Sequence, residues 1–283
     1  MTAQYSLEFF PPRAADAWAS FGQTAAELAA LGPAYVSVTF GAGGSVQGGT
    51  LEAVTMLREK LQLDTAPHIS CVNTDPALIR DLLARYREVG VRKLVVLRGD
   101  LPSGAGLPAG EFRYAADLVR FIRQETGDEF HIEVAAYPEM HPQARSPATD
   151  FKHFLAKVDC GANAAITQYF FNADAYFDFC EQVRAAGYDL PITPGIMPIT
   201  NHRQLSRFSQ ICGAEIPRWI RLRLEQYGDD LESIRDFGLD VVSRLCDTLM
   251  EGGAPGLHFY TLNKTAPTLA LWDRLQLPRP VAD

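Results

Sequence analysis

Apolar positions along the chain follow two patterns, short continuous runs and stripes that recur every three or four residues. A short apolar run bounded by glycine or proline is typical of a strand buried on both faces, and the wider spacing is typical of an amphipathic helix. We expect strands at residues 4–10, 35–39, 67–72, 94–97, 132–137, 164–170, 192–195 and 257–262. Helical stripes follow the strands, and a final helix is expected over 265–275.

Eight repeats of strand and helix predict an α/β fold, a closed (β/α)8 TIM barrel. The 283 residues are close to the typical barrel length of about 250 residues. A doubly wound open sheet is the alternative, but its dinucleotide fingerprint needs a third glycine where Val46 follows Gly41 and Gly43. The long gap from 195 to 256 carries helical pattern of its own. We therefore predict a single catalytic barrel domain over residues 1–283, with an elaborated segment between the seventh and eighth strands.

Composition narrows the possible partners. The net charge of −8 and the absence of any basic run argue against nucleic acid, which needs cations to neutralise its phosphates. The five cysteines show no C-x-x-C spacing, as in proteins of a reducing cytoplasm. We find no apolar stretch of about 18 residues that could cross a membrane, and no histidine and carboxylate spacing typical of a metal site. We expect a cytoplasmic protein without a nucleic-acid, membrane or metal partner.

Polar residues stand where the expected strands end. In a barrel the carboxyl ends of all the strands share one rim, and this rim carries the active site. We therefore expect these side chains to meet in space, where they would offer an acid, a base, a hydroxyl and an amide. They are Glu8, Thr39, His68, Arg98, Asp100, Tyr137 and Gln168.

Glu8 is the candidate acid of this rim. It stands between Leu7 and Phe9, and burial among apolar side chains makes a carboxyl group easier to protonate, as a general acid requires. A buried salt bridge is the alternative interpretation. His68 taken alone fits a hydrogen-bonded core histidine better than a ligand. The Gln168 amide fits either a strand-end hydrogen bond or the donor and acceptor edge of a heterocycle.

Nine motifs, in chain order and each at an expected strand end or in the loop after it, resemble those of the methylenetetrahydrofolate reductases. These are flavin-dependent barrel enzymes of folate one-carbon metabolism, and the resemblance covers nearly the whole chain. The motifs are SLEFFPP at 6–12, VSVT at 36–39 with GAGGS at 41–45, PH at 67–68, LRGDLP at 97–102, AAYPEMHP at 135–142, KVDCGAN at 157–163, ITQ at 166–168, PGIMP at 194–198 and HFYTLN at 258–263.

The resemblance implies a non-covalently bound FAD and a ping-pong reaction with small-molecule substrates. NADH or NADPH would reduce the flavin, which would then reduce 5,10-methylenetetrahydrofolate to 5-methyltetrahydrofolate. It also implies a homo-oligomer. By the same pattern Glu8 is the general acid, and Asp100 lies near the flavin and the pterin. The FAD-binding residues it implies are Thr39, Phe40, Ala42, His68, Arg98, Gly99, Asp100, Ala115, Tyr137, His141, Ala144, Asp150 and Lys157.

The resemblance also assigns substrate contacts, to Gln168, Gln204, Phe208 and Lys264. Lys264 stands where relatives carry arginine, so a point charge replaces a planar fork there. His153 and Ala156 stand where relatives use asparagine and arginine beside the FAD. Two other functions fit a barrel of this kind, a flavin-free pterin-binding methyltransferase and a non-catalytic relative. A visible spectrum separates the first from a flavoprotein.

Overall fold

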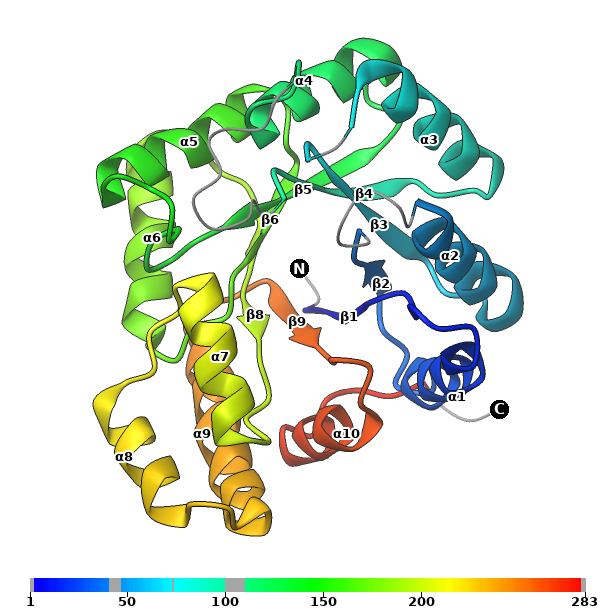
Figure 1. Ribbon diagram of the computed structural model, residues 1–283. Helices are drawn as coiled ribbons and strands as arrows, with labels where there is room; N and C mark the ends of the chain where they lie inside the picture. The colour runs from blue at the N-terminus through cyan, green and yellow to red at the C-terminus, as the bar shows by residue number, and fades with distance from the viewer. Residues whose placement is uncertain (1–2, 41–46, 73, 100–109, 281–283) are drawn as a thin grey trace.

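The strands of this computed structural model, which describes residues 3–40, 47–72, 74–99 and 110–280, form one parallel sheet. Its strand order is β7-β6-β5-β4-β3-β2-β1-β9-β8. Figure 1 shows the strands curled into a barrel with helices around the outside. The strands are β1 (Gln4–Phe9), β2 (Tyr35–Val38), β3 (Thr65–Ser70), β4 (Lys93–Leu97), β5 (His131–Ala136), β6 (Ala164–Thr167), β7 (Ile192–Thr193), β8 (Gly195–Ile196) and β9 (Gly256–Tyr260).

The predicted TIM barrel is confirmed, with one change at its seventh strand position. The predicted strand 192–195 consists of two short pieces, because Pro194 lacks the N–H that a continuous strand would donate. β7 pairs with β6, whereas β8 pairs with β9. The Pro194 carbonyl still accepts from the backbone N–H of His258 at 3.0 Å. β7 and β8 together therefore join the two ends of the sheet, β6 on one side and β9 on the other.

Helices follow the strands and cover the outside of the barrel (Figure 1). The predicted elaborated segment between the seventh and eighth strand positions of the barrel is present, and it contains α7, α8 and α9. The helices are α1 (Ala17–Ala29), α2 (Gln47–Leu61), α3 (Pro76–Glu88), α4 (Ala115–Thr126), α5 (Pro147–Asp159), α6 (Ala173–Ala185), α7 (His202–Cys212), α8 (Arg218–Tyr227), α9 (Leu231–Glu251) and α10 (Thr265–Arg274).

Three predicted strands extend at least two residues past their observed ends, and the first of them, predicted over 67–72, ends at Ser70. The strand predicted over 164–170 ends at Thr167, and the one predicted over 257–262 ends at Tyr260. Leu262 and Asn263 both have φ of 52°, in the left-handed region that no strand contains. The chain therefore turns at the rim two residues earlier than the apolar pattern indicates.

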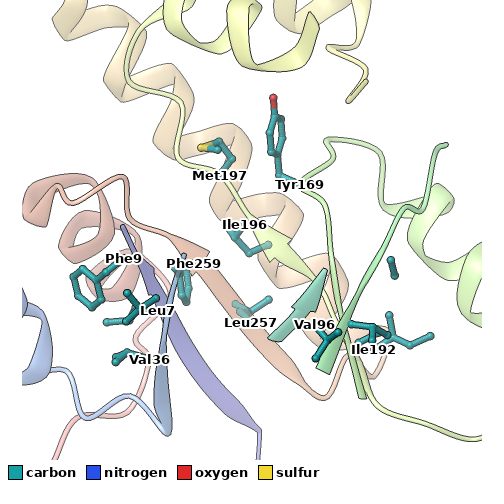
Figure 2. Packing of buried hydrophobic residues seen from close by; sticks show 14 of the residues in the cluster. Leu7, Phe9, Val36, Val96, Tyr169, Ile192, Ile196, Met197, Leu257 and Phe259 are labelled. Atoms are coloured by element: carbon teal, nitrogen blue, oxygen red, sulfur yellow. The ribbon is translucent and has the colours of Figure 1, made fainter. Parts of the chain in front are cut away.

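The two faces of the strands are buried in different surroundings. The outward face packs against the helices and is apolar, with Leu7, Phe9, Val36 and Phe259 in one continuous core (Figure 2). The inward face carries a small apolar cluster that includes Val95. Since side chains alternate between the faces of a strand, every second residue of β1 points into the barrel. Much of what fills the barrel is polar, namely Ser6, Glu8, Ser37, His68, Glu133 and His258.

Candidate active site

A cavity of about 450 Å³ opens at the carboxyl-terminal rim of the barrel. The structure brings eight of the sequence-derived candidates to its wall from β1, β3 and α7 and from the residues that follow β2, β4, β5 and β6. Apolar and aromatic side chains, among them Leu97, Met197 and Tyr260, line the rest. The eight candidates are Glu8, Thr39, Phe40, His68, Gly99, Tyr137, Gln168 and Phe208.

Glu8 lies against two histidines that come from other strands. Its Oε2 is 3.3 Å from His68 Nε2 and 3.7 Å from His258 Nε2. The Ser37 hydroxyl, on the neighbouring strand, donates to the same oxygen at 3.5 Å. The 3.3 Å contact has the length of an ion pair but not the geometry of a hydrogen bond, so His68 Nε2 is buried without a hydrogen-bond partner in the part of the chain that the structure describes.

The electrostatics of Glu8 differ from the sequence-based expectation. Burial raises the pKa of the carboxyl group, but His258 and His68 outweigh burial and lower the pKa from 4.5 to about 2. The expectation that Glu8 protonates more easily than usual is therefore wrong for the protein without substrate. The partners lie on β3 and β9, and the sequence around Glu8 contains no trace of them. Glu8 is an ionised carboxylate that needs a change of surroundings before it can donate a proton.

A second group of candidates lies around the ends of β4 and β5. The Arg98 guanidinium donates to Gln143 Oε1 and contacts His141 Nε2 at 3.4 Å. The Tyr137 and His141 rings are 4.6 Å apart. The backbone N–H of His141 donates to Asp150 Oδ2 at 2.7 Å. These contacts tie the loop after β5 to the first turn of α5, and they place four cofactor-binding candidates together.

Lys157 and Arg98 make this region positive. The Lys157 ammonium donates to the Ala135 carbonyl at 2.5 Å. Burial, and secondarily the charge of Arg98, lower the pKa of Lys157 to about 8, although Asp150 acts in the opposite direction. Two cations close enough to influence each other favour an anionic ligand, because a phosphate would relieve their repulsion.

Gly99 directly follows Arg98 in the chain and lines the same cavity as Glu8 and His68. Its φ is 88°, and a Cβ added there would lie 2.1 Å from Ser70 Oγ. Only glycine fits this position without a shift of β3. Two further cofactor-binding candidates are alanines. The Ala144 N–H donates to the His141 carbonyl at 2.9 Å, and Ala115 is the buried first residue of α4.

The substrate-binding candidates divide between two cavities. Gln168 and Phe208 line the rim cavity. Gln204 and Lys264 line a second cavity, of about 930 Å³, which α7, α9 and α10 enclose. There the Lys264 ammonium donates to Gln204 Oε1 at 3.4 Å. Two further candidates, Ala42 and Asp100, lie outside the residues that the structure describes.

The sequence interpretation missed His258, Ser37 and Ser6 as site residues, and it placed Tyr260 at the rim end of the last strand without a role. His258 is fully buried, and its Nδ1 lies 2.7 Å from the Ser6 hydroxyl. The Tyr260 hydroxyl donates to the Thr167 carbonyl at 2.6 Å, and burial followed by the Glu8 carboxylate raises its pKa well above 10. A histidine two residues before a tyrosine in a buried strand is the signal that could have identified this inner face.

The described residues contain neither a candidate metal site nor a helix that could span a membrane. No group of three or more His, Cys, Asp and Glu side chains within residues 3–40, 47–72, 74–99 and 110–280 could hold a metal ion. None of the helices that the structure describes is both long enough and apolar enough to span a membrane.

Comparison with known proteins gives a consistent result. Residues 1–276 match the family model described as methylenetetrahydrofolate reductase. The chain is 37% identical over 277 residues to a 5,10-methylenetetrahydrofolate reductase of Pectobacterium carotovorum subsp. carotovorum, with 98% of this chain and 91% of the relative covered. It is 36% identical over 266 residues to the protein of the same name from Escherichia coli (strain K12), with 94% and 88% covered.

A solved structure shares the fold at low sequence identity. It is described as an uncharacterized protein from Clostridium thermocellum that binds two copies of 5-methyl-5,6,7,8-tetrahydrofolic acid. The TM-score is 0.66 at 16% identity, and the match covers 95% of this chain and 93% of the other. At this identity the likeness supports the barrel fold alone.

Proposed function

The chain belongs to the methylenetetrahydrofolate reductase family, and on that premise we propose that it reduces 5,10-methylenetetrahydrofolate with a hydride passed from NADH or NADPH through bound FAD. Family membership makes it an enzyme of folate one-carbon metabolism. The carrier, the order of the two hydride transfers and the roles of single residues are our proposal. The observation that carries it is the Glu8 carboxylate in the rim cavity, held between His68 and His258.

The residues around the rim fit FAD. Arg98 and Lys157 would hold its two phosphates, because they are cations close enough for the charge of Arg98 to act on Lys157. The buried His68 Nε2, which lacks a hydrogen bond among the described residues, is an atom that a polar ring edge would satisfy. Gly99 lines the same cavity, and its missing Cβ leaves the space that the Ser70 side chain occupies. When bound, FAD supplies an acceptor and donor of hydride that the side chains of the chain lack.

Glu8 would act on the folate. Opening the five-membered ring of methylenetetrahydrofolate requires a proton on the departing nitrogen, and a positioned acid accelerates such a step by typically 10²–10⁴-fold. The carboxylate is ionised in the protein alone, because the two histidines stabilise its charge. A folate that covers the rim would remove water from Glu8, and the added desolvation favours the protonated form. The bound substrate would thus create the acid that it needs.

Gln168, Phe208, Gln204 and Lys264 would bind the substrates. Gln168 keeps its NH2 group available, since its Oε1 already accepts from the Tyr169 N–H at 3.0 Å, and a pterin edge offers acceptors to such a donor. Phe208 adds an apolar face to the same cavity. Lys264 and Gln204 would contact whatever part of the ligand extends toward the second cavity. We keep Asp100 as a proposed neighbour of flavin and pterin on the motif alone.

Absorbance in the visible range tests the cofactor. The purified protein should be yellow, or turn yellow and retain FAD after incubation with it and removal of the excess. NADH or NADPH should bleach the bound flavin, and methylenetetrahydrofolate should restore its colour. A protein that binds methyltetrahydrofolate but never FAD would contradict the proposal, and would favour a flavin-free pterin-binding methyltransferase.

We further propose that the enzyme is cytoplasmic, that it is a homo-oligomer and that residues 1–283 form one catalytic domain. All five cysteines are free, which supports a reducing compartment. The oligomer rests on the family resemblance, and light scattering of the purified protein tests it.

A further inference from the structure

Below the rim cavity, polar side chains continue down the inside of the barrel. The Ser37 hydroxyl lies 3.5 Å from both Glu8 Oε2 and His258 Nε2, so it bridges the two groups. On its other side His258 contacts Ser6 through Nδ1, at 2.7 Å. His258 and Ser6 are also register partners on β9 and β1. These contacts connect Glu8 to the middle of the barrel.

The connection continues from Ser6 to the lower half of the barrel through Tyr35. Tyr35 is the register partner of Ser6 on β2, and its ring centre lies 6.3 Å from that of His258. Burial, followed by the Glu133 carboxylate, raises the pKa of Tyr35 well above 10, although Ser6 acts in the opposite direction. The Tyr35 hydroxyl donates to Glu133 Oε2 at 2.6 Å. The Lys93 ammonium, in turn, donates to Glu133 Oε1 at 3.2 Å and lies 3.8 Å from the centre of the Tyr35 ring.

The lower end of this column reaches solvent. His131 Nε2 is 3.7 Å from Glu133 Oε1, and the His131 side chain is 43% exposed. Lys93 and His131 are the first residues of β4 and β5. The first residues of barrel strands lie at the face opposite the active-site rim. Glu8 at one end of the barrel is therefore linked to water at the other.

A purely structural role explains this column poorly. The inside of such barrels is usually filled by branched apolar side chains, and a buried ion pair is weak support for stability compared with apolar packing. Here the polar residues form one continuous path, with a carboxylate in the reactive cavity at its top and titratable, solvent-accessible groups at its bottom. This is the arrangement that proton movement requires.

The proposed reaction needs such a path. Each turnover adds one hydride and one proton to the folate, so Glu8 must regain a proton once per cycle. FAD and folate would both lie over the rim and exclude water from that side. Glu8 is faced by His68, His258 and Tyr260. Among the described residues, His258 is the one of these three whose contacts continue down the barrel toward solvent.

We propose that Ser37, His258, Ser6, Tyr35 and Glu133 form a proton relay through the barrel, which supplies Glu8 from solvent at the Lys93 and His131 end while ligands cover the rim. The inference rests on the proposed function, in which Glu8 is the acid. These residues act through Glu8 and touch neither substrate nor cofactor. The relay assigns a purpose to the five side chains that the reaction at the rim leaves unexplained.

The transfer is balanced at every step. His131 takes a proton from water and gives it to Glu133, or the Lys93 ammonium gives one of its protons to Glu133 and is then reprotonated by water. The Tyr35 oxygen receives it and passes its own hydrogen to Ser6, and Ser6 passes its hydrogen to His258 Nδ1. The proton on His258 Nε2 then goes to the Glu8 carboxylate, directly or through the Ser37 hydroxyl. One O–H or N–H bond forms for each that breaks, no group is oxidised or reduced, and the hydroxyls and the imidazole tautomer then reset.

Two substitutions, each of which removes one hydroxyl group, should interrupt the relay without moving Glu8. Tyr35→Phe removes one hydroxyl and keeps the ring under Lys93, and Ser6→Ala breaks the path at a second point. Each should slow reoxidation of the reduced flavin by methylenetetrahydrofolate by about tenfold or more, part of the 10²–10⁴-fold that a general acid supplies. The solvent deuterium isotope effect on this step should rise, and reduction by the nicotinamide should keep its rate. Tyr86→Phe, which removes another fully buried hydroxyl, on α3, is the matched control.

A second measurement needs no ligand and no turnover. In the protein alone, the imidazole ¹⁵N shifts of His258 should respond to Glu133→Gln in the wild-type background and should not respond in the Tyr35→Phe background. Wild-type reoxidation rates and isotope effects in both Tyr35→Phe and Ser6→Ala would overturn the relay. If Glu8→Gln still abolished the folate step in that case, the proposed function would stand. If Glu8→Gln also had no effect, the proposed function itself would fail.

Discussion

Two buried carboxylates inside the same barrel are held in different ways. Glu8, near the rim end of β1, is surrounded by two histidines and a serine at 3.3 to 3.7 Å, and lines a cavity. Glu133, on β5, is fixed by a 2.6 Å hydrogen bond and a 3.2 Å contact with a lysine. Loose contacts with groups that can change charge leave Glu8 responsive to a ligand. Short contacts with a tyrosine hydroxyl and a lysine ammonium hold Glu133 in one place between the two groups.

Removal of the Glu133 charge tests the anchored side of this comparison and should have the largest effect on stability. Glu133→Gln leaves the Lys93 ammonium, 18% exposed, without its carboxylate. An unpaired, mostly buried cation should cost roughly 2–4 kcal/mol in the free energy of unfolding. Urea unfolding measures the loss. Arg203→Gln is the control, because the Arg203–Asp229 pair is 85% and 87% exposed and should contribute less than about 0.5 kcal/mol. Equal losses would contradict the anchored geometry.

Glu8→Gln sharpens the comparison through pH. The folded-state pKa of Glu8 is about 2, below its ordinary 4.5, so its carboxylate stabilises the fold above about pH 4.5, and this contribution is lost as the pH falls toward 2. At neutral pH the substitution should cost about 2–3 kcal/mol. The difference between wild type and variant should vanish toward the acid end of that window in urea unfolding at a series of pH values. A difference that stays constant with pH would mean that the histidines do not hold Glu8 ionised.

Gly99→Ala tests the region between the two groups. The added Cβ would lie 2.1 Å from Ser70 Oγ at a φ of 88°, so we expect a loss of about 1–3 kcal/mol in stability and weaker binding of FAD. Fluorescence quenching of added FAD measures the second effect. Gly127→Ala is the matched control, because Gly127 has a φ of 56° and no atom within 4 Å of an added Cβ. Undiminished FAD affinity in Gly99→Ala would remove Gly99 from the cofactor site.

Lys157 makes the smallest prediction, again through pH. Its pKa is lowered to about 8 in the protein alone, and a bound phosphate would raise it. The affinity for FAD should therefore be full below pH 8 and should fall as the pH rises above it, by at most about tenfold per pH unit. Lys157→Met should bind FAD more weakly and without this pH dependence. A flat profile in the wild type would place the phosphates elsewhere.

The apolar pattern predicted the barrel well because each strand reports its own burial. It did not reveal the break between β7 and β8, although Pro194 stands in the sequence. The pattern alone does not say that the pieces before and after Pro194 pair with different strands. Helix α8 was also missed: its buried residues are Ile220 and Leu224, while Trp219 and Leu222 are exposed, so the helical stripe is too narrow to recognise.

The site was predicted in its members more than in its chemistry. Glu8, His68 and Gln168 stand at strand ends, so the topology alone brings them to one cavity. The sign of the Glu8 pKa shift was wrong because it depends on histidines from β3 and β9 that local sequence cannot place beside it. Glu133, Tyr35 and Lys93 were not singled out at all, since their significance lies in contacts between strands and at the opposite end of the barrel.

Stopped-flow absorbance of the flavin in Glu8→Gln tests the central claim most directly. Glutamine keeps the size of the side chain and cannot deliver a proton. We expect NADH or NADPH to reduce the variant at nearly the wild-type rate, because that transfer needs alignment of two rings and no acid. Reoxidation by methylenetetrahydrofolate should slow by about 10²–10⁴-fold. Equal slowing of both steps, or of neither, would contradict the assignment of Glu8 as the acid that opens the folate ring.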